Sequence, residues 1–422
     1  MKMCWITSVA VLGAALLTGY AVAEYVEFED VNVERAVRKA IDKPEGPIDA
    51  SNLVGKGFTE LACHGMGVDS LKGLEHCKDL MTLYLWANHI TDLSPLAGLT
   101  KLTKVRLDQN QIENLTPLKG LVNLTSLDLF RNKIKNLAPL ADLTNLTDLN
   151  VSVNEVEDLS PLKKMAKLTS LTAIVNKIVD LSPLAGLEAL KHLQLNDNKI
   201  ADMQPLADLK ELSTLRLGNN GIADVSGLAE LTKMQSLNLS GNQIVDISAL
   251  ADMVALSTLD LEDNQVTDIA PLAGKRNIII LTLSGNEIVD LTPLADLSRL
   301  SIFCASHNQI RDISPLAELT NLSKLSLYDN QIAGLAPLKK LTHLVEIDLA
   351  HNNVSSVADL CSREKWRKDV RICLCGNHIV QGELHERQLQ QLRDMGVTIC
   401  CTSPLPECGS AGSLWLPAGA RR

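Results

Sequence analysis

The most constraining feature of this chain of 422 residues is a ladder of thirteen asparagines that recur every 22 residues without an insertion or deletion. The members of this asparagine ladder are Asn88, Asn110, Asn132, Asn154, Asn176, Asn198, Asn220, Asn242, Asn264, Asn286, Asn308, Asn330 and Asn352. A period of this length is typical of a solenoid, because each repeat is too small to bury its own apolar face and must stack on its neighbours. We therefore predict one repeat array rather than several globular domains.

One repeat shows which elements the period contains. The alternation of Leu83 and Leu85 with polar or aromatic residues predicts a short strand with one buried face. Asn88 follows the strand, where a side-chain amide that both donates and accepts is useful to turn groups that cannot reach water. Ser94 and Pro95 then read as an N-cap and a first helical residue. Little chain remains before the next strand, so we expect a tight 3₁₀-like turn rather than a long helix.

The repeat reads Leu-x-Leu-x-x-Asn-x-Ile-x-Asp-Leu-x-Pro-Leu, and this pattern resembles the bacterial leucine-rich repeats of the internalin class over roughly residues 60–360. The resemblance implies an α/β solenoid: a curved array with a parallel sheet on its concave side and short 3₁₀ turns on its convex side. It also implies an exported binding protein that uses the concave sheet. Internalins usually continue into an immunoglobulin-like domain and often a wall anchor, and we do not expect the wall-attached form of that function here.

The ends of the array predict caps. Apolar residues at helical spacing precede the repeats and are similar to the internalin helical cap, which would cover an otherwise open sheet edge: Val33, Ala36, Val37, Ala40 and Ile41. A last strand around Ile372 and an amphipathic helix from Glu383 to Met395 follow the repeats. We predict five segments, namely a signal peptide at 1–23, a helical N-terminal cap at 24–60, the repeat array at 61–360, a cysteine-rich C-terminal cap at 361–401 and a flexible tail at 402–422.

The N-terminus predicts export. Lys2 precedes an apolar stretch from Ile6 to Leu17, and Ala21-Val22-Ala23 has the form of a signal-peptidase site. The apolar stretch is shorter than the ~20 residues of a spanning helix. We therefore expect a secreted, periplasmic or cell-surface protein without a stable membrane span. The formal net charge of −10 disfavours nucleic acid as a partner. A protein, peptide or glycan partner and no cofactor are expected.

The residues four and two positions before each ladder asparagine should point out of the concave sheet. Aromatic residues occupy some of these positions, and charged residues lie beside them in adjacent repeats. The predicted partner-binding residues are Tyr84, Trp86, Arg106, Asp108, Asp128, Phe130, Arg131 and Tyr328. Tyr, Trp and Arg dominate the energetics of interfaces, which favours a binding site. The alternative is a set of isolated exposed aromatics without a partner.

A local acidic spot occurs later on the same face, at Asp260, Glu262 and Asp263. These carboxylates would suit a basic partner or a cation. We expect a solvated charge cluster instead, because no loop with the ligand spacing of a calcium site accompanies them.

Cysteine usage also favours an exported protein. Removal of Cys4 with the signal peptide leaves nine cysteines, of which eight lie in the first coil of the array or after its last repeat. Cys63 and Cys77 replace core leucines and predict a bridge or a buried thiol pair. A bridge from Cys373 or Cys375 to Cys400 is our preferred pairing in the C-terminal cap. Since nine is odd, one thiol is left over, and Cys304 is the candidate, because it should point outward from the array.

The sequence also offers three interpretations other than a binding module. A zinc site built from the C-terminal cysteines and His378 is disfavoured by the ligand spacing. Cysteine-dependent catalysis by Cys375 with His378, His385 and Glu383 would need a catalytic domain beyond a short cap, so we expect no enzyme. Eukaryotic phosphatase regulators also use 22-residue leucine-rich repeats inside cells, but the export signal and the cysteines favour an exported protein.

Overall fold

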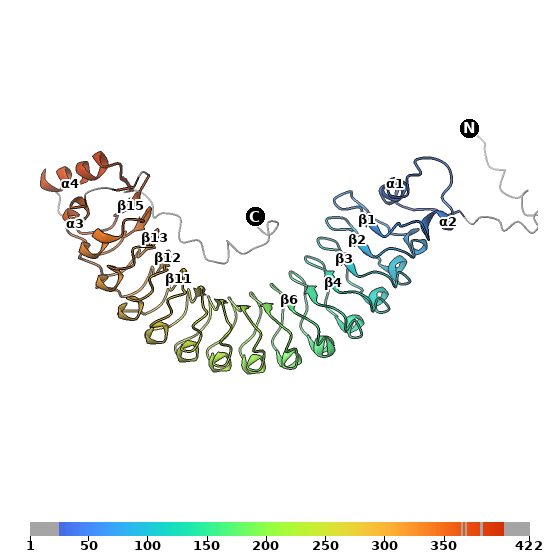
Figure 1. The fold of residues 1–422 in the computed structure, drawn as a ribbon, viewed down its shortest axis with the longest axis horizontal. Helices are drawn as coiled ribbons and strands as arrows, with labels where there is room; N and C mark the ends of the chain where they lie inside the picture. The colour runs from blue at the N-terminus through green and yellow to red at the C-terminus, as the bar shows by residue number, and fades with distance from the viewer. Residues whose placement is uncertain (1–24, 364–365, 368, 380–382, 401–422) are drawn as a thin grey trace, which may run out of the picture. The chain divides into compact units, whose positions relative to one another are not determined.

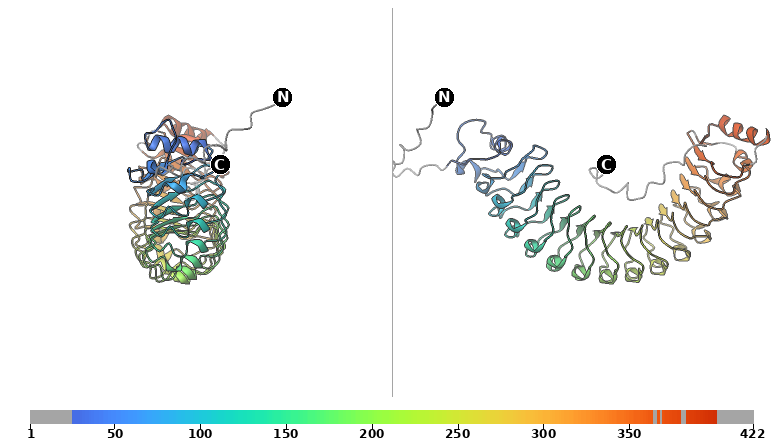
Figure 2. Two further views of the ribbon diagram at one scale, coloured as in Figure 1. Left: turned by 90° about the vertical axis from the view of Figure 1, so that its right-hand side faces the viewer. Right: turned by 180° about the vertical axis from the view of Figure 1, so that it is seen from behind.

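The computed structural model describes residues 25–363, 366–367, 369–379 and 383–400. The chain forms two compact units, residues 1–134 and residues 135–422, and each is described by itself. Figure 1 shows both units as stacks of flat coils, each coil made of one strand, one outer turn and the connections between them. In each unit the strands lie on one side of the stack and the 3₁₀ turns on the other (Figure 2). The predicted repeat solenoid is confirmed.

The first unit begins with two helices and continues with four parallel strands. Its helices and strands are α1 Val31–Ala40, α2 Ala50–Leu53, β1 Glu60–Ala62, β2 Thr82–Tyr84, β3 Lys104–Arg106 and β4 Ser126–Asp128. Its 3₁₀ turns are η1 Leu74–His76, η2 Ser94–Leu96 and η3 Thr116–Leu118. Each strand pairs with the next in register, so that Leu61, Leu83, Val105 and Leu127 form one buried column. Helix α1 buries Val33 and Val37 and contacts β1.

The second unit continues the same pattern through twelve strands that pair in chain order. Its strands are β5 Asp148–Asn150, β6 Ser170–Thr172, β7 His192–Gln194, β8 Thr214–Arg216, β9 Ser236–Asn238, β10 Thr258–Asp260, β11 Ile280–Thr282, β12 Ile302–Cys304, β13 Lys324–Ser326, β14 Glu346–Asp348, β15 Arg371–Cys373 and β16 Thr398–Cys400. Its helices and turns are η4 Ala138–Leu140, η5 Ser160–Lys164, η6 Ser182–Leu184, η7 Gln204–Leu206, η8 Ser226–Leu228, η9 Ser248–Leu250, η10 Ala270–Leu272, η11 Thr292–Leu294, η12 Ser314–Leu316, η13 Ala336–Lys340, α3 Ala358–Cys361 and α4 Glu383–Asp394.

The core of each coil is a set of leucine and isoleucine side chains with almost no exposed surface. Leu83, Leu85, Ile90, Leu93 and Leu96 of one repeat are all 1% exposed or less. A coil of this size has no second layer of its own, so these side chains are buried only because the coils before and after it cover them. Burial of apolar surface, at about 25 cal/mol per Å², therefore stabilises the stack and not the single repeat.

The ladder asparagines satisfy buried backbone groups at the turns, as the sequence predicts, and within each unit some of these groups belong to the previous coil. Asn198 Nδ2 donates to the carbonyl of Ala173 in the previous coil at 3.0 Å and to the carbonyl of Leu195 at 2.9 Å. Its Oδ1 accepts from the amide of Ile178, also in the previous coil, at 3.0 Å. The residue before it, Asp197, has φ of 58°, which turns the chain so that the amide points inward. Backbone groups that no strand partner reaches are satisfied in this way.

The ladder has one further member that the 22-residue period does not reveal. Asn377 follows Asn352 after 25 residues, yet it donates to the carbonyl of Leu349 at 2.7 Å and accepts from the amide of Val354 at 2.9 Å. The additional residues are accommodated on the turn side, where helix α3 replaces the usual 3₁₀ turn. Asn377 therefore keeps the hydrogen bonds of the ladder although it does not keep the 22-residue spacing.

The predicted N-cap role of Ser94 is wrong. Ser94 is the first residue of η2, and the side chain two residues earlier does the capping: Asp92 Oδ1 accepts from the Ser94 amide at 2.8 Å. The Ser94 hydroxyl donates to Asp92 Oδ2 at 2.6 Å. This is an Asx turn, in which a short carboxylate accepts from the backbone two residues on. It explains the aspartate of the repeat pattern, which the sequence analysis left without a role.

Two expectations about cysteines are also wrong. No disulfide joins Cys373 or Cys375 to Cys400, although Cys373 and Cys400 are register partners on β15 and β16. Cys304 does not point into solvent as an accessible thiol: it is 1% exposed and is disulfide-bonded. For Cys63 and Cys77 we predicted either a bridge or a buried thiol pair, and the structure shows the buried thiol pair. Burial raises the pKa of each thiol to about 12. Such thiols stay protonated at neutral pH.

We predict that Asn198→Ala lowers the free energy of unfolding by about 1–3 kcal/mol, because it leaves the Ile178 amide and the Ala173 carbonyl without their partner. Lys199→Ala, an exposed neighbour, serves as the control and should leave stability within about 0.5 kcal/mol of the wild type. Chemical denaturation monitored by circular dichroism measures both. Equal denaturation midpoints for the two variants would contradict the assigned role of the ladder.

Candidate binding surface

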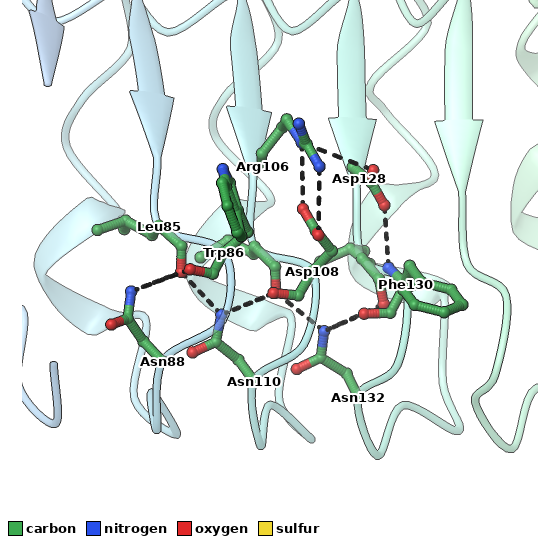
Figure 3. Close-up of polar contacts among 11 residues, drawn as sticks. Leu85, Trp86, Asn88, Arg106, Asp108, Asn110, Asp128, Phe130 and Asn132 are labelled. Atoms are coloured by element: carbon green, nitrogen blue, oxygen red, sulfur yellow. Dashed lines mark hydrogen bonds and ion pairs between the residues drawn. The ribbon is translucent and has the colours of Figure 1, made fainter. Parts of the chain in front are cut away.

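The first unit brings most of the predicted site residues together at the ends of three adjacent strands. Tyr84 and Arg106 are the last residues of β2 and β3, and Asp128 is the last residue of β4. Trp86 and Phe130 follow two residues after their strands, and Figure 3 shows both rings together with Arg106 and Asp128 at the strand ends. Tyr84 is partly exposed. The parallel register explains this arrangement, since residues 22 apart stack in one column.

Trp86 is held between two other side chains. Its ring stacks on His64 with centroids 4.4 Å apart and planes 8° apart. The guanidinium of Arg106 lies 5.6 Å from the centroid of the Trp86 ring. His64 is a site residue that the sequence analysis missed: it stands 22 residues before Trp86, in the same column, but its coil has no ladder asparagine to mark the register. The indole remains partly exposed and is positioned before any partner binds.

Arg106 is fixed by two carboxylates (Figure 3). Its Nε and Nη2 donate to the two oxygens of Asp108 at 3.1 and 3.2 Å, and its Nε lies 3.8 Å from Asp128 Oδ2. Asp108 is only 4% exposed, so it acts by holding Arg106 and offers little surface to a partner. A bidentate pair of this kind orients the guanidinium and keeps it over the indole. Arg106 itself is partly exposed.

Phe130 is oriented by the residue two positions before it. The Phe130 amide donates to Asp128 Oδ1 at 3.1 Å, which fixes the backbone where the ring leaves the strand (Figure 3). The ring is partly exposed. Arg131 comes next with φ of 54° and is exposed. Tyr84 has Lys104 Nζ at 5.9 Å from its ring centroid.

Tyr328 belongs to the second unit and to a different cluster. Its ring makes edge contacts with His307 and His351, with centroids 5.0 and 5.1 Å apart. It also packs against Ala350 and Cys373. Both histidines directly precede a ladder asparagine and were not singled out from the sequence. Tyr328 therefore belongs to a cluster of the second unit, whereas the other seven predicted site residues belong to the first unit.

The acidic spot in the second unit is only in part the solvated cluster that we expected, since Asp263 is exposed and Glu262 is partly exposed, whereas Asp260 is buried. Asp260 is 1% exposed, accepts from Asn238 Nδ2 at 2.7 Å and accepts from the Glu262 amide at 3.1 Å. Desolvation by burial raises the pKa of Asp260 to about 6, and the charge of Asp263 acts in the same direction, against the hydrogen bond from Glu262. The prediction is wrong for Asp260 because it assumed open solvent over the end of β10.

No metal-binding or membrane-spanning feature occurs in the part of the chain that the structure describes. No three or more His, Cys, Asp or Glu side chains gather there as metal ligands. The helices within the same ranges are too short or too polar to cross a bilayer.

The raised pKa of Asp260 predicts a pH dependence. The folded protein keeps this carboxyl neutral up to about pH 6, whereas the unfolded chain ionises it near its ordinary value of 3.8. Its contribution to stability is fully present below pH ~4 and is lost as the pH rises through about 6. Asp260→Asn should therefore gain about 2–3 kcal/mol relative to the wild type between pH 4 and pH 7. Unfolding at several pH values measures this difference.

Glu262→Gln is the control for the same experiment, because it removes a neighbouring carboxylate that is partly exposed. Its stability difference from the wild type should change little over the same pH range. A pH-independent difference for Asp260→Asn would contradict the assigned burial.

Comparisons with known proteins agree with this architecture. The family model described as leucine-rich repeats in two copies matches residues 66–120, 122–164, 188–230, 210–252, 232–274 and 320–362. Among curated proteins, none matches the sequence. An internalin, InlF, from Listeria monocytogenes is 33% identical, with a TM-score of 0.73, over 75% of this chain and 94% of that chain.

Two further solved structures share the fold at lower identity. The functional domain of InlJ from Listeria monocytogenes is 22% identical, with a TM-score of 0.66, over 82% of this chain and 81% of that chain. A leucine-rich-repeat protein of Leptospira interrogans is also 22% identical, with a TM-score of 0.66, over 78% and 81%. The asparagine ladder, the parallel sheet and these matches together lead to one assignment. The chain belongs to the leucine-rich-repeat proteins and is an internalin-like member of that family.

Proposed function

We propose that this protein is an exported leucine-rich-repeat protein that binds a protein or peptide partner with the exposed side of the sheet in its first unit. The binding site is the Trp86 surface, defined as His64, Tyr84, Trp86, Arg106 and Phe130. The observation that carries this proposal is the packing of Trp86, which stacks on His64 and faces Arg106 while remaining partly exposed. Preorganised aromatic and arginine side chains lose little entropy on binding, which is why they dominate interfaces.

The charges around the site define the kind of partner. Arg106 is paired with the carboxylates of Asp108 and Asp128, so these three side chains together carry more negative than positive charge. Lys104 and Arg131 add positive charge at its edge. A partner that places an apolar side chain on Trp86 and hydrogen-bond acceptors near Arg106 suits this surface. A glycan that stacks a sugar face on Trp86 is the alternative with the same contacts.

The double variant Trp86→Ala/Phe130→Ala tests the site. It should leave the thermal midpoint within a few degrees, since both rings are partly exposed, and weaken binding by ~2 kcal/mol or more, about thirtyfold in Kd. A photo-crosslinking residue at the exposed position of Arg131 identifies the partner first. The binding of that partner to wild type and variant is then measured by calorimetry.

The matched control is Val179→Ala/Val245→Ala, which removes two apolar side chains that are 56% and 53% exposed in the second unit. It should bind like the wild type. Unchanged affinity of the Trp86→Ala/Phe130→Ala variant would refute the site, and a large loss of its stability would show that the rings belong to the core.

Export is a separate part of the proposal. The signal sequence that supports it, residues 1–23, lies outside the described residues. The competing intracellular scaffold has one observation in its favour, because six described cysteines form no disulfide. We predict that the native protein begins at Glu24 and that Cys304 resists alkylation until it is reduced. N-terminal sequencing and thiol mapping measure both. Retention of Met1 together with full alkylation of every cysteine would favour the intracellular scaffold.

A further inference from the structure

The second unit brings three aromatic side chains together beyond the ends of β12, β13 and β14. His307, Tyr328 and His351 come from three consecutive coils, and each stands one or two residues before a ladder asparagine. The Tyr328 ring makes edge contacts with both imidazoles, with planes at 72° and 65°. Asp329 follows Tyr328 and lies beside His307. These four residues, His307, Tyr328, Asp329 and His351, are called the Tyr328 cluster below.

The rings of the Tyr328 cluster have fixed positions. Tyr328 packs against Ala350 and Cys373, both of which are fully buried. A Cβ atom on Gly376 would lie 2.7 Å from Nδ1 of His351, so a glycine at this position leaves room for the imidazole. Tyr328 is partly exposed, and both histidines are exposed. The cluster is therefore a preformed surface and not a part of the core.

Asp329 gives this surface a negative charge. Its Oδ2 accepts from Nδ1 of His307 at 2.8 Å, which uses one of the roughly four lone-pair sites of a carboxylate. The Asp329 side chain is 59% exposed, so the remaining acceptor sites can be reached from solvent. The faces of aromatic rings also carry negative partial charge. With neutral imidazoles, the Tyr328 cluster therefore attracts a cation.

The first unit shows what such a combination of ring and carboxylate holds. Trp86 occupies the same position of its repeat as Tyr328, two residues before a ladder asparagine. The guanidinium of Arg106 lies 5.6 Å from the centroid of the Trp86 ring and donates to both oxygens of Asp108. A guanidinium that meets a ring and a carboxylate together is thus an arrangement that this repeat geometry can accommodate.

The equivalent arginine is replaced in the second unit. Arg106 follows Trp86 by 20 residues, whereas the residue 20 positions after Tyr328 is Asp348. Asp348 is 3% exposed and accepts from the Ala350 amide at 3.0 Å. A carboxylate therefore stands where the first unit supplies its own guanidinium.

The cations of the neighbouring coils are engaged with other groups. Nε of Arg311 donates to Gln331 Oε1 at 2.8 Å, and Nζ of Lys324 lies 3.2 Å from Glu346 Oε2. Within the described ranges, no Lys or Arg side chain lies over the Tyr328 ring. A cation that completes the arrangement seen at Trp86 would come from another molecule.

We propose that the Tyr328 cluster is a second interaction site, which binds an arginine side chain of a protein or peptide partner. The guanidinium pairs with Asp329 and stacks on Tyr328. Arginine fits better than lysine, because a planar guanidinium can stack on a ring and donate two parallel hydrogen bonds to a carboxylate, whereas an ammonium is a more strongly hydrated point charge. This inference does not depend on the Trp86 surface, whose residues belong to the first unit.

Three blocked tripeptides test the site. Acetyl-Gly-Arg-Gly-amide, its lysine analogue and its citrulline analogue are titrated separately into the full chain with ¹³C-labelled histidine. The ring signals of His307 and His351, assigned with single histidine-to-glutamine variants, report binding by NMR. The arginine peptide should shift both signals and bind at least ~5-fold more tightly than the citrulline peptide, which has nearly the same shape but no charge. The lysine peptide should bind with intermediate affinity.

Asp329→Asn tests the carboxylate. Asparagine keeps the size of the side chain and tolerates the φ of 52° at this position, so the fold is retained. The variant should bind the arginine peptide about 3- to 5-fold more weakly and lose its preference over the citrulline peptide. Tyr328→Leu removes the ring and should weaken binding by a similar factor. Chemical denaturation confirms that both variants are folded.

Asp197→Asn is the matched control. Asp197 is exposed, has φ of 58° and stands at the same position of its repeat, but its neighbour is Asn196 and not an aromatic ring. This variant should bind the arginine peptide like the wild type. Unshifted His307 and His351 signals, equal affinities for the arginine and citrulline peptides, or an unchanged affinity of Asp329→Asn would overturn the proposal. These signals arise in the second unit, so a failure here is distinguishable from a failure of the Trp86 surface.

Discussion

The side-chain amide of the ladder asparagine is the interaction on which the structure depends. Within each unit, the amide satisfies a carbonyl 25 residues earlier and an amide 20 residues earlier, as Asn198 does for Ala173 and Ile178. These groups lie inside a stack of coils, where an unmet hydrogen bond costs about 1–3 kcal/mol. The leucines supply the larger part of the stabilisation, but they would tolerate small shifts between coils. The amide does not, and so it fixes the register of each coil on the one before it.

The fold could be predicted from the sequence because the residue types repeat with the same period as the coils. Apolar residues at the positions of Leu83 and Leu85, and asparagine at the position of Asn88, recur in every repeat and specify a strand, a buried face and a turn. The errors occurred where the period carries no information. Asn377 keeps the geometry at a different spacing, and the capping of η2 belongs to Asp92 rather than to Ser94. The roles of Asn377 and Asp92 could not be predicted, because a local motif does not show which hydrogen-bond partners a side chain reaches.

The sequence could predict which strand positions form the candidate site, but not which of these side chains are buried. Counting back from the ladder placed Trp86 and Phe130 on the exposed side of the sheet, where they lie. Burial was not predictable, because it depends on the neighbouring columns and on what covers them. Asp108 lies under Arg106, and Asp260 is buried at the end of β10. His64 shares the column of Trp86 but carries no marker of its own, so only the stacking of the rings identifies it.

The direction of the ladder limits how the length of this protein can change. Within each unit the ladder asparagines bond to backbone groups of the coil before them, as Asn198 does for Ala173. A coil is therefore complete only when another asparagine follows it, and Asn377 completes the coil that contains Leu349. New repeats can therefore be inserted between existing coils, whereas a repeat lost from the C-terminal side takes away hydrogen bonds of the coil that remains. Residues can be added on the outer side, as α3 shows, because no ladder contact is made there. Insertion of whole repeats is thus tolerated between coils, whereas insertion of a few residues is tolerated on the turn side of a coil.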